Sequence, residues 1–511
     1  MKILMINVSC GTGSTGRICT DLAQALEAQG HQVKIAYGRD DVPEQFQKYA
    51  HRIGNAVGVY GHVLRARLLD EAGFGSRLQT QAFIRWVEEF DPDIIHLHNL
   101  CGYYIHLGVL FRYLRSCGKP IYWTHHDCWA FTGHSVYCDS AGCTRWQQGC
   151  HHCPMQHQFP AAFVDGSARN WQRKKALFTG IPGVQLIAPS QWLADQLRQS
   201  FLEQYPVTVI HNGINTAQFR PQEDDTRRFL GAEGKHLVLC FGKEAAKNSP
   251  LTGDGSLHVV YGEDFSGREL ETLCRQADAV VDLTGEGKSF QSLFGADTPV
   301  YDKADLASAA EISRLSLPAE DVQAGYWRCK KAAGLLGKEV LLGVASVWND
   351  QKGLSDFVKL AGMLTQRQQL VMIGLTKSQL EALPTNIMGM ERTANVQELA
   401  MYYGIADYFL NLTYQDTYPT TNLEAISCGT PVITYETGGS PESAGHFGAC
   451  VPRGDVTAAA KLILEHPCFQ KEDWDCDNAV FLKKQMEIYK YIAGTTIYRL
   501  VGAKRPRHGV N

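Results

Sequence analysis

The sequence of 511 residues has no apolar run that approaches the roughly 20 residues needed to cross a bilayer, so it predicts no membrane-spanning helix. It also predicts no export signal, because Met1-Lys2 lead directly into the strand-like apolar segment ILMINVS. Neither sign of charge dominates, since 49 basic and 53 acidic residues leave a net charge of −4. This balance gives no reason to expect a nucleic-acid partner. We therefore expect a cytoplasmic protein.

Cysteine is not rare, but its sixteen residues are scattered, except for one cluster between residues 128 and 153. In a reducing cytoplasm thiols are expected rather than disulfides. Cys150 and Cys153 have the spacing of a zinc knuckle, and Cys138 and Cys143 could complete a tetrahedral site. The cluster is therefore either a structural zinc site or a set of free thiols packed in a loop.

The chain is long enough for two or three domains, and its short apolar runs are each followed by a polar turn and a helical segment. This alternation predicts an α/β fold with buried parallel strands. At the N-terminus, Gly11, Gly13 and Gly16 follow the first strand and fit the pattern GxGxxG. An NAD(P)-type oxidoreductase is therefore one alternative, although Tyr37-Gly38-Arg39 stand where that class carries an acidic residue.

The most informative stretch covers residues 345–442. Lys352 follows a predicted strand, and a polar loop that contains Asp416 leads into a predicted helix, where we expect Glu424 in the first turn. A helix N-terminus favours a bound phosphate, a carboxylate can accept hydrogen bonds from sugar hydroxyls, and a lysine can neutralise a diphosphate. The residues alone therefore predict a nucleotide-diphosphate site at the carboxyl ends of parallel strands.

This stretch resembles the donor-binding half of the family 4 retaining glycosyltransferases, which have the GT-B fold. Asp416-x7-Glu424 corresponds to the Glu-x7-Glu motif of that family, with the first carboxylate one methylene shorter. The Lys-Gly pair of the family corresponds to Lys352-Gly353. The later GG-x-PE motif corresponds to Gly438-Gly439 and Pro441-Glu442. Many members carry an arginine just before the lysine, where this chain has Ser346, Val347 and Trp348.

The N-terminal half resembles the same family. The segments HDCWAFTGH and CTRWQQGCHHCP are similar to the subgroup of capsule and exopolysaccharide enzymes of the colanic acid type. The resemblance implies that His126 and Asp127 lie at the reaction centre, and that the glycine loop faces the donor phosphate. A histidine that only caps a turn is the structural alternative for His126.

The resemblance thus implies two Rossmann-like domains facing across a cleft, and transfer of a hexose, with retention, from a nucleotide-diphosphate sugar to a saccharide acceptor, which can be lipid-linked. No cofactor or divalent ion is implied. The implied catalytic residues are His126, Asp127, Lys352 and Glu424. The implied donor-binding residues are Gly13, Gly16, Arg17, Lys352, Asp416, Thr420, Asn422, Glu424, Gly439 and Glu442. The alternative is a non-catalytic protein that has the same fold but only binds its ligands.

The expected domains are an acceptor-side domain over residues 1–221, an insertion over 232–338, a nucleotide-sugar domain over 339–475, and a returning helix with a basic tail over 476–511. The insertion is unusual, since in the family the two halves follow one another almost directly. It echoes the nucleotide-sugar domain: Ala277-Asp278 matches Ala406-Asp407, and TPV recurs at residues 298 and 430. A degenerate partial repeat and chance similarity both explain the echo. The tail at residues 504–508 (KRPRH) could meet anionic lipid or be a frayed terminus.

Overall fold

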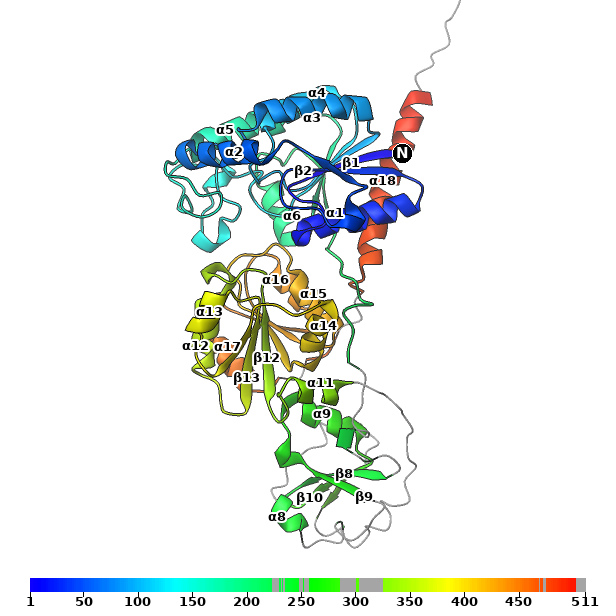
Figure 1. The fold of residues 1–511 in the computed structure, drawn as a ribbon, viewed down its shortest axis with the longest axis vertical. Coiled ribbons are helices and arrows are strands. Elements are labelled where there is room, and N and C mark those ends of the chain that lie inside the picture. Colours follow the sequence, from blue (N-terminus) through cyan, green and yellow to red (C-terminus); the bar gives the residue numbers. More distant parts are fainter. Residues whose placement is uncertain are drawn as a thin grey trace, which may run out of the picture.

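A computed structural model describes residues 1–222, 229–230, 232, 235–247, 251, 257–284, 300–302, 325–467, 469–471 and 475–501, with side chains of the last helix to Tyr489. It contains three parallel sheets, stacked along the long axis of the molecule (Figure 1). The predicted α/β class is confirmed, because every pair of neighbouring strands in these sheets is parallel. The basic tail at 504–508 lies outside the described residues, as does part of the insertion.

The N-terminal unit has seven strands in the order β3-β2-β1-β4-β5-β6-β7. They are β1 (Lys2–Asn7), β2 (Gln32–Tyr37), β3 (Ala50–Arg52), β4 (Ile94–Leu97), β5 (Ile121–Thr124), β6 (Val184–Ala188) and β7 (Val207–Val209). The helices are α1 (Gly13–Ala28), α2 (Ala56–Leu69), α3 (Arg77–Phe90), α4 (Leu107–Ser116), α5 (Ser167–Phe178) and α6 (Gln191–Arg198). Alternate residues of β1 enter cores on opposite faces of the sheet, as the pleat requires.

The C-terminal unit has six strands in the order β14-β13-β12-β15-β16-β17. They are β12 (Glu339–Val344), β13 (Gln368–Ile373), β14 (Ile387–Met390), β15 (Tyr408–Asn411), β16 (Val432–Tyr435) and β17 (Gly448–Val451). The helices are α12 (Leu354–Ala361), α13 (Lys377–Ala382), α14 (Val396–Ile405), α15 (Thr420–Ser427), α16 (Ser440–Ala444) and α17 (Val456–Leu464). The last helix, α18 (Asn478–Val501), returns to the N-terminal unit, where Phe481 and Tyr489 join its core.

The insertion forms a four-stranded sheet in the order β11-β10-β8-β9. Its strands are β8 (His236–Phe241), β9 (Leu257–Tyr261), β10 (Ala279–Asp282) and β11 (Val300–Asp302), and its helices are α8 (Lys243–Ala246), α9 (Gly267–Gln276) and α11 (Tyr326–Ala332). Helices α9 and α11 lie between this sheet and the C-terminal unit, on the side away from the N-terminal unit (Figure 1). One core cluster contains residues of both, including Leu239, Trp327 and Leu342.

The insertion and the C-terminal unit share a detailed pattern of strand pairing. Their sheet orders correspond, and α9 and α14 each have 10 residues followed directly by Ala-Asp. Asp278 exchanges two hydrogen bonds of 2.8 Å with the backbone of Leu237. Asp407 does the same with Val340, at 2.8 and 2.6 Å. The sequence echo therefore corresponds to equal positions in two sheets.

Candidate functional site

The two larger sheets direct the carboxyl ends of their central strands into the interface between the units. In the N-terminal unit the strand order reverses between β1 and β4, and in the C-terminal unit it reverses between β12 and β15. Ligands of open α/β sheets bind beyond the strands at such switch points. The loops that follow these strands carry the glycine turn, the His98 segment, Lys352 and Asp416.

The first predicted pair is in direct contact. Lys352 Nζ lies 3.0 Å from Asp416 Oδ2, and both side chains are partly exposed. Gly353, which follows the lysine, has φ of 77°, and a Cβ there would lie 2.2 Å from the carbonyl oxygen of Leu412. The glycine of the Lys-Gly motif thus lets the two loops approach closely enough to bring Lys352 and Asp416 together.

Glu424 lies deeper in the C-terminal unit than the sequence suggested. Its expected place in the first turn is wrong, because α15 begins at Thr420 and Glu424 is the fifth residue, one turn further along. The side chain is 9% exposed and accepts a hydrogen bond of 2.9 Å from the hydroxyl of Tyr403. Burial raises the pKa of Glu424 to about 7, while the Tyr403 hydrogen bond and the charge of Arg17 in the opposite unit oppose this shift.

The glycine pair Gly438-Gly439 packs against the Asp416 loop. A Cβ at Gly438 would lie 1.8 Å from the carbonyl oxygen of Asp416, and one at Gly439 would lie 1.9 Å from that of Thr417. Asn422 is fully buried. Its side-chain oxygen accepts a hydrogen bond of 2.8 Å from the Asn411 amide, and its side-chain nitrogen donates one of 2.9 Å to the Ser443 hydroxyl. These residues therefore shape the loops around the cleft, and the amide of Asn422 is already engaged within the protein.

Glu442 has partners in the opposite unit. Its two carboxylate oxygens accept hydrogen bonds of 2.7 Å each from the backbone N–H groups of Gln191 and Trp192, at the N-terminus of α6. Ser190 caps the same helix by accepting a hydrogen bond of 3.2 Å from Leu193 N. Glu442 thus joins the two units, and its contact with the donor stays a prediction. Further contacts across the interface include the Thr417 hydroxyl, which donates to the His126 carbonyl oxygen at 3.1 Å.

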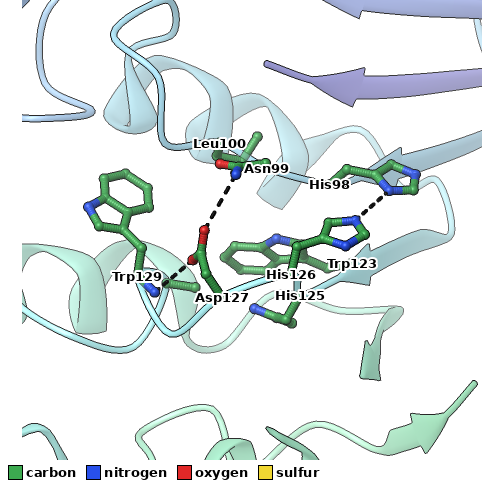
Figure 2. A pocket seen from close by; sticks show the side chains of 9 residues that line it. His98, Asn99, Leu100, Trp123, His125, His126, Asp127 and Trp129 are labelled. Atoms are coloured by element: carbon green, nitrogen blue, oxygen red, sulfur yellow. Dashed lines mark hydrogen bonds between the residues drawn. The ribbon is translucent and has the colours of Figure 1, made fainter. Parts of the chain in front are cut away.

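His126 and Asp127 lie in the loop after β5 and line a small pocket with His98, Asn99, Leu100, Trp123, His125, Trp129 and Ala130 (Figure 2). Burial lowers the pKa of His126 to about 4 and raises the pKa of Asp127 to about 6. Asp127 accepts from Trp129 N at 2.8 Å, and the Asn99 amide lies 3.4 Å from its other oxygen. Tryptophan rings beside hydrogen-bonding side chains suit a ligand that carries hydroxyl groups.

The glycine turn lies at the carboxyl end of β1, and the neighbouring strand β4 leads into the Asn99 side of this pocket. Gly11 N donates to Gly16 O at 3.1 Å, and a Cβ at Gly16 would approach the Ser9 hydroxyl to 2.7 Å. Gly13 opens α1 with φ of 66°. The exposed side chain of Arg17 follows within the first turns of α1, and its charge reaches Glu424. The turn therefore offers a helix N-terminus and a cation to the cleft.

Several side chains around the cleft escaped the sequence analysis. The hydroxyl of Tyr403 donates a hydrogen bond to Glu424, and His98 Nδ1 lies 3.1 Å from His126 Nε2. Lys174, which is fully buried, donates to the carbonyl oxygens of Trp129 and Thr132 at 2.7 and 3.1 Å and so supports the loop of Asp127. A pattern of HxH at the end of a buried strand was the available signal for His98. Tyr403 and Lys174 have no local signal, because their partners are distant in sequence.

The four cysteines of the candidate zinc site are only partly gathered. Burial raises the pKa of Cys150 and Cys153 to about 11, and Gly133 N donates to Cys150 Sγ at 3.2 Å. Within the described part of the chain, no three His, Cys, Asp or Glu side chains are arranged to hold a metal ion. Zinc needs deprotonated thiolates around one point. Burial, followed by the charges of Cys143, Cys150 and Cys153, raises the pKa of Cys138, so the four thiols do influence one another.

Zinc at Cys138, Cys143, Cys150 and Cys153 stays a prediction that elemental analysis decides. We expect protein purified without chelator to contain well under one zinc per chain. A content of one zinc per chain that disappears in a Cys150→Ser, Cys153→Ser variant would instead assign the ion to this cluster.

Comparisons with known proteins agree with this geometry. Residues 15–218 match the model of Glycosyltransferase Family 4, and residues 338–466 match that of Glycosyl transferases group 1. The chain is 28% identical over 318 residues to the colanic acid biosynthesis glycosyl transferase WcaC of Escherichia coli K12, which covers 55% of this chain and 77% of that protein.

Two solved structures with low sequence identity share the fold. Sucrose-phosphate synthase of Thermosynechococcus elongatus has a TM-score of 0.56 at 14% identity, over 97% of this chain and 99% of its own. Anabaena HepE in complex with UDP and glucose has a TM-score of 0.53 at 11% identity, over 96% of this chain and 100% of its own. Residues 219–337 lie between the two family matches.

Proposed function

Because the chain belongs to the family 4 glycosyltransferases of the GT-B fold, we propose that it transfers a hexose from a nucleotide-diphosphate sugar to a saccharide hydroxyl, with retention, in polysaccharide biosynthesis. The observation that carries the proposal is the interface between the two units. Lys352, Asp416 and Glu424 lie on one wall of it, and the His126 pocket lies on the other. The Thr417–His126 hydrogen bond joins these walls.

In this reaction Lys352 neutralises the negative charge that grows on the departing diphosphate, and the free N–H groups at the start of α15 assist it. Glu424 accepts hydrogen bonds from the ribose hydroxyls, and Asp416 accepts them from the sugar. Arg17 adds a second cation from the opposite wall. His126 and Asp127 contact the sugar near its anomeric carbon. The units exclude water when they close, which protects the donor from hydrolysis.

The experiment is a transfer and hydrolysis assay with a panel of UDP- and GDP-sugars, run with and without EDTA. We expect turnover of at least one donor at a rate that EDTA leaves unchanged. A strict requirement for Mg²⁺ or Mn²⁺ would contradict the metal-free mechanism. Donor binding without turnover would favour the scaffold alternative, and oxidation of NAD(P)H would favour the oxidoreductase.

We also propose that the N-terminal unit contacts a membrane surface through α2. Val57, Tyr60, Leu64 and Leu68 recur every three or four residues along this helix, and between 49% and 78% of each side chain is exposed. Exposed Phe163 lies beside them, because its N–H donates to Arg67 O at 2.8 Å. Within the part of the chain that the structure describes, no helix is both long and apolar enough to cross a bilayer.

Charge favours anionic lipid as the occupant of this face. Arg65, Arg67 and Arg77 are exposed there, whereas the neighbouring acids Asp70 and Glu71 are buried. Asp70 pairs with His134 at 2.6 Å, and the carboxylate of Glu71 is bound by Arg65 and Arg173. An apolar stripe flanked by arginines inserts at the level of lipid headgroups and is drawn to negative charge.

Sedimentation with vesicles tests this contact. Wild-type protein should bind vesicles that contain phosphatidylglycerol more strongly than vesicles of phosphatidylcholine alone. A Tyr60→Ser, Leu64→Ser variant should lose most of this binding while keeping its folded spectrum. The matched control, Met363→Ser with Leu464→Ser, removes two exposed apolar side chains of the C-terminal unit and should bind normally. Equal vesicle binding by all three proteins would contradict the proposal.

We propose that residues 232–338 are a partial second copy of the C-terminal unit. This copy packs against the C-terminal unit and folds together with it. The equal sheet orders, helix lengths and Asp–backbone pairs support a copy. Besides the shared apolar core, the docking contact includes a buried ionic cluster: Lys330, which is fully buried, lies 3.2 Å from Glu269 and 3.5 Å from Asp407. Asp407 therefore joins α11 of the insertion to β12 of the C-terminal unit. No glutamate of the copy corresponds to Glu424.

Thermal unfolding tests whether the insertion folds with the C-terminal unit. Lys330→Met should destabilise the protein by about 3–5 kcal/mol, because it leaves two buried carboxylates without their cation. The exposed Lys331→Met is the matched control and should change stability by less than about 0.5 kcal/mol. If Lys330→Met lowers the melting temperature of a separate transition and leaves that of the C-terminal unit unchanged, the insertion is an independent domain.

A further inference from the structure

Three histidines connect the C-terminal helix to the pocket of His126. The hydroxyl of Tyr489 on α18 lies 2.5 Å from His96 Nδ1, and His96 Nε2 lies 2.8 Å from the hydroxyl of Thr124. The rings of His96 and His98 are 4.0 Å apart. His98 Nδ1 then lies 3.1 Å from His126 Nε2, and these two rings are nearly parallel (Figure 2).

The contact between His98 and His126 joins two neutral rings. Burial lowers the pKa of His126 to about 4 and holds that of His98 well below its usual range, so neither imidazole is protonated at neutral pH. A neutral imidazole has one N–H and one acceptor nitrogen. The single proton between the rings therefore belongs either to His98 Nδ1 or to His126 Nε2.

The surroundings of His98 decide between these two arrangements. His98 is 2% exposed, and its Nε2 is buried without a hydrogen-bond partner. If His126 donated, His98 would carry its proton on that Nε2 and would bury an unpaired N–H. Buried donors without a partner are rarer in proteins than buried acceptors without one. The favoured arrangement has His98 donating from Nδ1, and His126 then carries its own proton on Nδ1.

We propose that His98 is a positioning residue for the transfer reaction: by donating to His126 Nε2, it holds that ring in one orientation and one tautomer, with Nδ1–H free to bind an oxygen of the sugar. Among the described residues, His126 Nδ1 has no hydrogen-bond partner, and His126 lines the pocket. The inference rests on the proposed function, because it needs a sugar in that pocket. Asn99 and Trp129 line the same pocket (Figure 2).

Two substitutions separate the hydrogen bond from the volume of the ring. His98→Phe keeps an aromatic ring but cannot donate, so kcat should fall by about 10–100-fold, by analogy with the loss of partners that orient metal-binding histidines. His98→Asn places its amide where His98 Nδ1 lies, so it should recover most of the loss. The donor KM should change less than kcat in both variants, because the reacting geometry is affected more than donor binding.

Tyr489→Phe is the matched control, because it also removes one buried hydrogen bond to a histidine of the same row. It should lower the melting temperature while leaving kcat within about threefold. His126→Ala measures the role of His126 itself. If His126→Ala loses activity while His98→Phe keeps wild-type kcat, the inference about His98 is overturned and the proposed function stands. If both variants are fully active, the proposed role of the pocket fails together with the inference.

A folding defect of His98→Phe does not remove the test. His98→Gln places its amide one bond further along, where the unpartnered Nε2 lies. His98→Asn should then be more active than His98→Gln, by about tenfold in kcat. Equal activities of the two amides would show that no donor at the Nδ1 position is needed, and would overturn the inference.

Discussion

Replacing Lys352 with alanine should lower kcat by at least about 10²–10³-fold, or roughly 3–4 kcal/mol in transition-state free energy. The diphosphate gains charge as the glycosidic bond breaks, so a preorganised cation stabilises the transition state more than the bound donor. The arginine that many relatives carry upstream is absent here, and Trp348, one of the three residues in its place, is buried with its indole N–H donated to Ile373 O at 2.9 Å. We therefore expect Lys352 to stabilise more of the diphosphate charge than it does in relatives that also carry the upstream arginine.

Matched variants make the Lys352 result specific. Lys352→Arg should rescue only in part, because the guanidinium differs from the ammonium in reach and geometry. Lys377→Ala removes an exposed lysine of α13 and should leave both kinetic constants unchanged. A Lys352→Ala enzyme with normal kcat and only a raised donor KM would show that this lysine binds donor and transition state equally. Normal values of both kcat and the donor KM would indicate that Arg17, rather than Lys352, binds the diphosphate.

Replacing Glu424 with alanine should abolish transfer while the protein stays folded. The loss follows from removal of the acceptor for the ribose hydroxyls. Folding should survive, because burial raises the pKa of Glu424 to about 7 and the ionised carboxylate is therefore not a source of stability. Asp416→Ala should be milder than Glu424→Ala, since the shorter side chain also engages Lys352. Activity of Glu424→Ala within a few-fold of wild type would contradict the assignment of the donor site.

The raised pKa of Glu424 also predicts a dependence on pH. Only the ionised carboxylate accepts from two hydroxyls, so the donor KM of the wild-type enzyme should rise as pH falls through about 7. For stability the sign is opposite. Between the ordinary pKa of 4.5 and about 7 the folded state retains a proton that the unfolded state has lost, so the wild type loses stability relative to Glu424→Gln as pH rises. Parallel pH profiles for the two proteins would contradict both statements.

The sequence determined the α/β class because alternating strands and helices are a local signal, which each segment carries in its own periodicity. It also placed Lys352 and Asp416 in loops that follow strands, and those loops do meet at the switch point between β12 and β15. The glycines of the Lys-Gly and GG motifs stand where backbones approach each other closely. The predicted position of Glu424 was wrong by one helical turn, because helix boundaries depend on capping contacts that local patterns define poorly.

The side-chain partners were decided by the tertiary structure alone. Glu442 belongs to a motif predicted to bind the donor, yet its carboxylate caps a helix 250 residues away. Tyr489 reaches His96 across 393 residues, and Lys330 meets Asp407 across 77. Such contacts depend on how sheets and units stack, and a sequence pattern of a few residues carries no information about that stacking. The sequence thus determined which loops bear the reactive groups, whereas packing decided which group each of them faces.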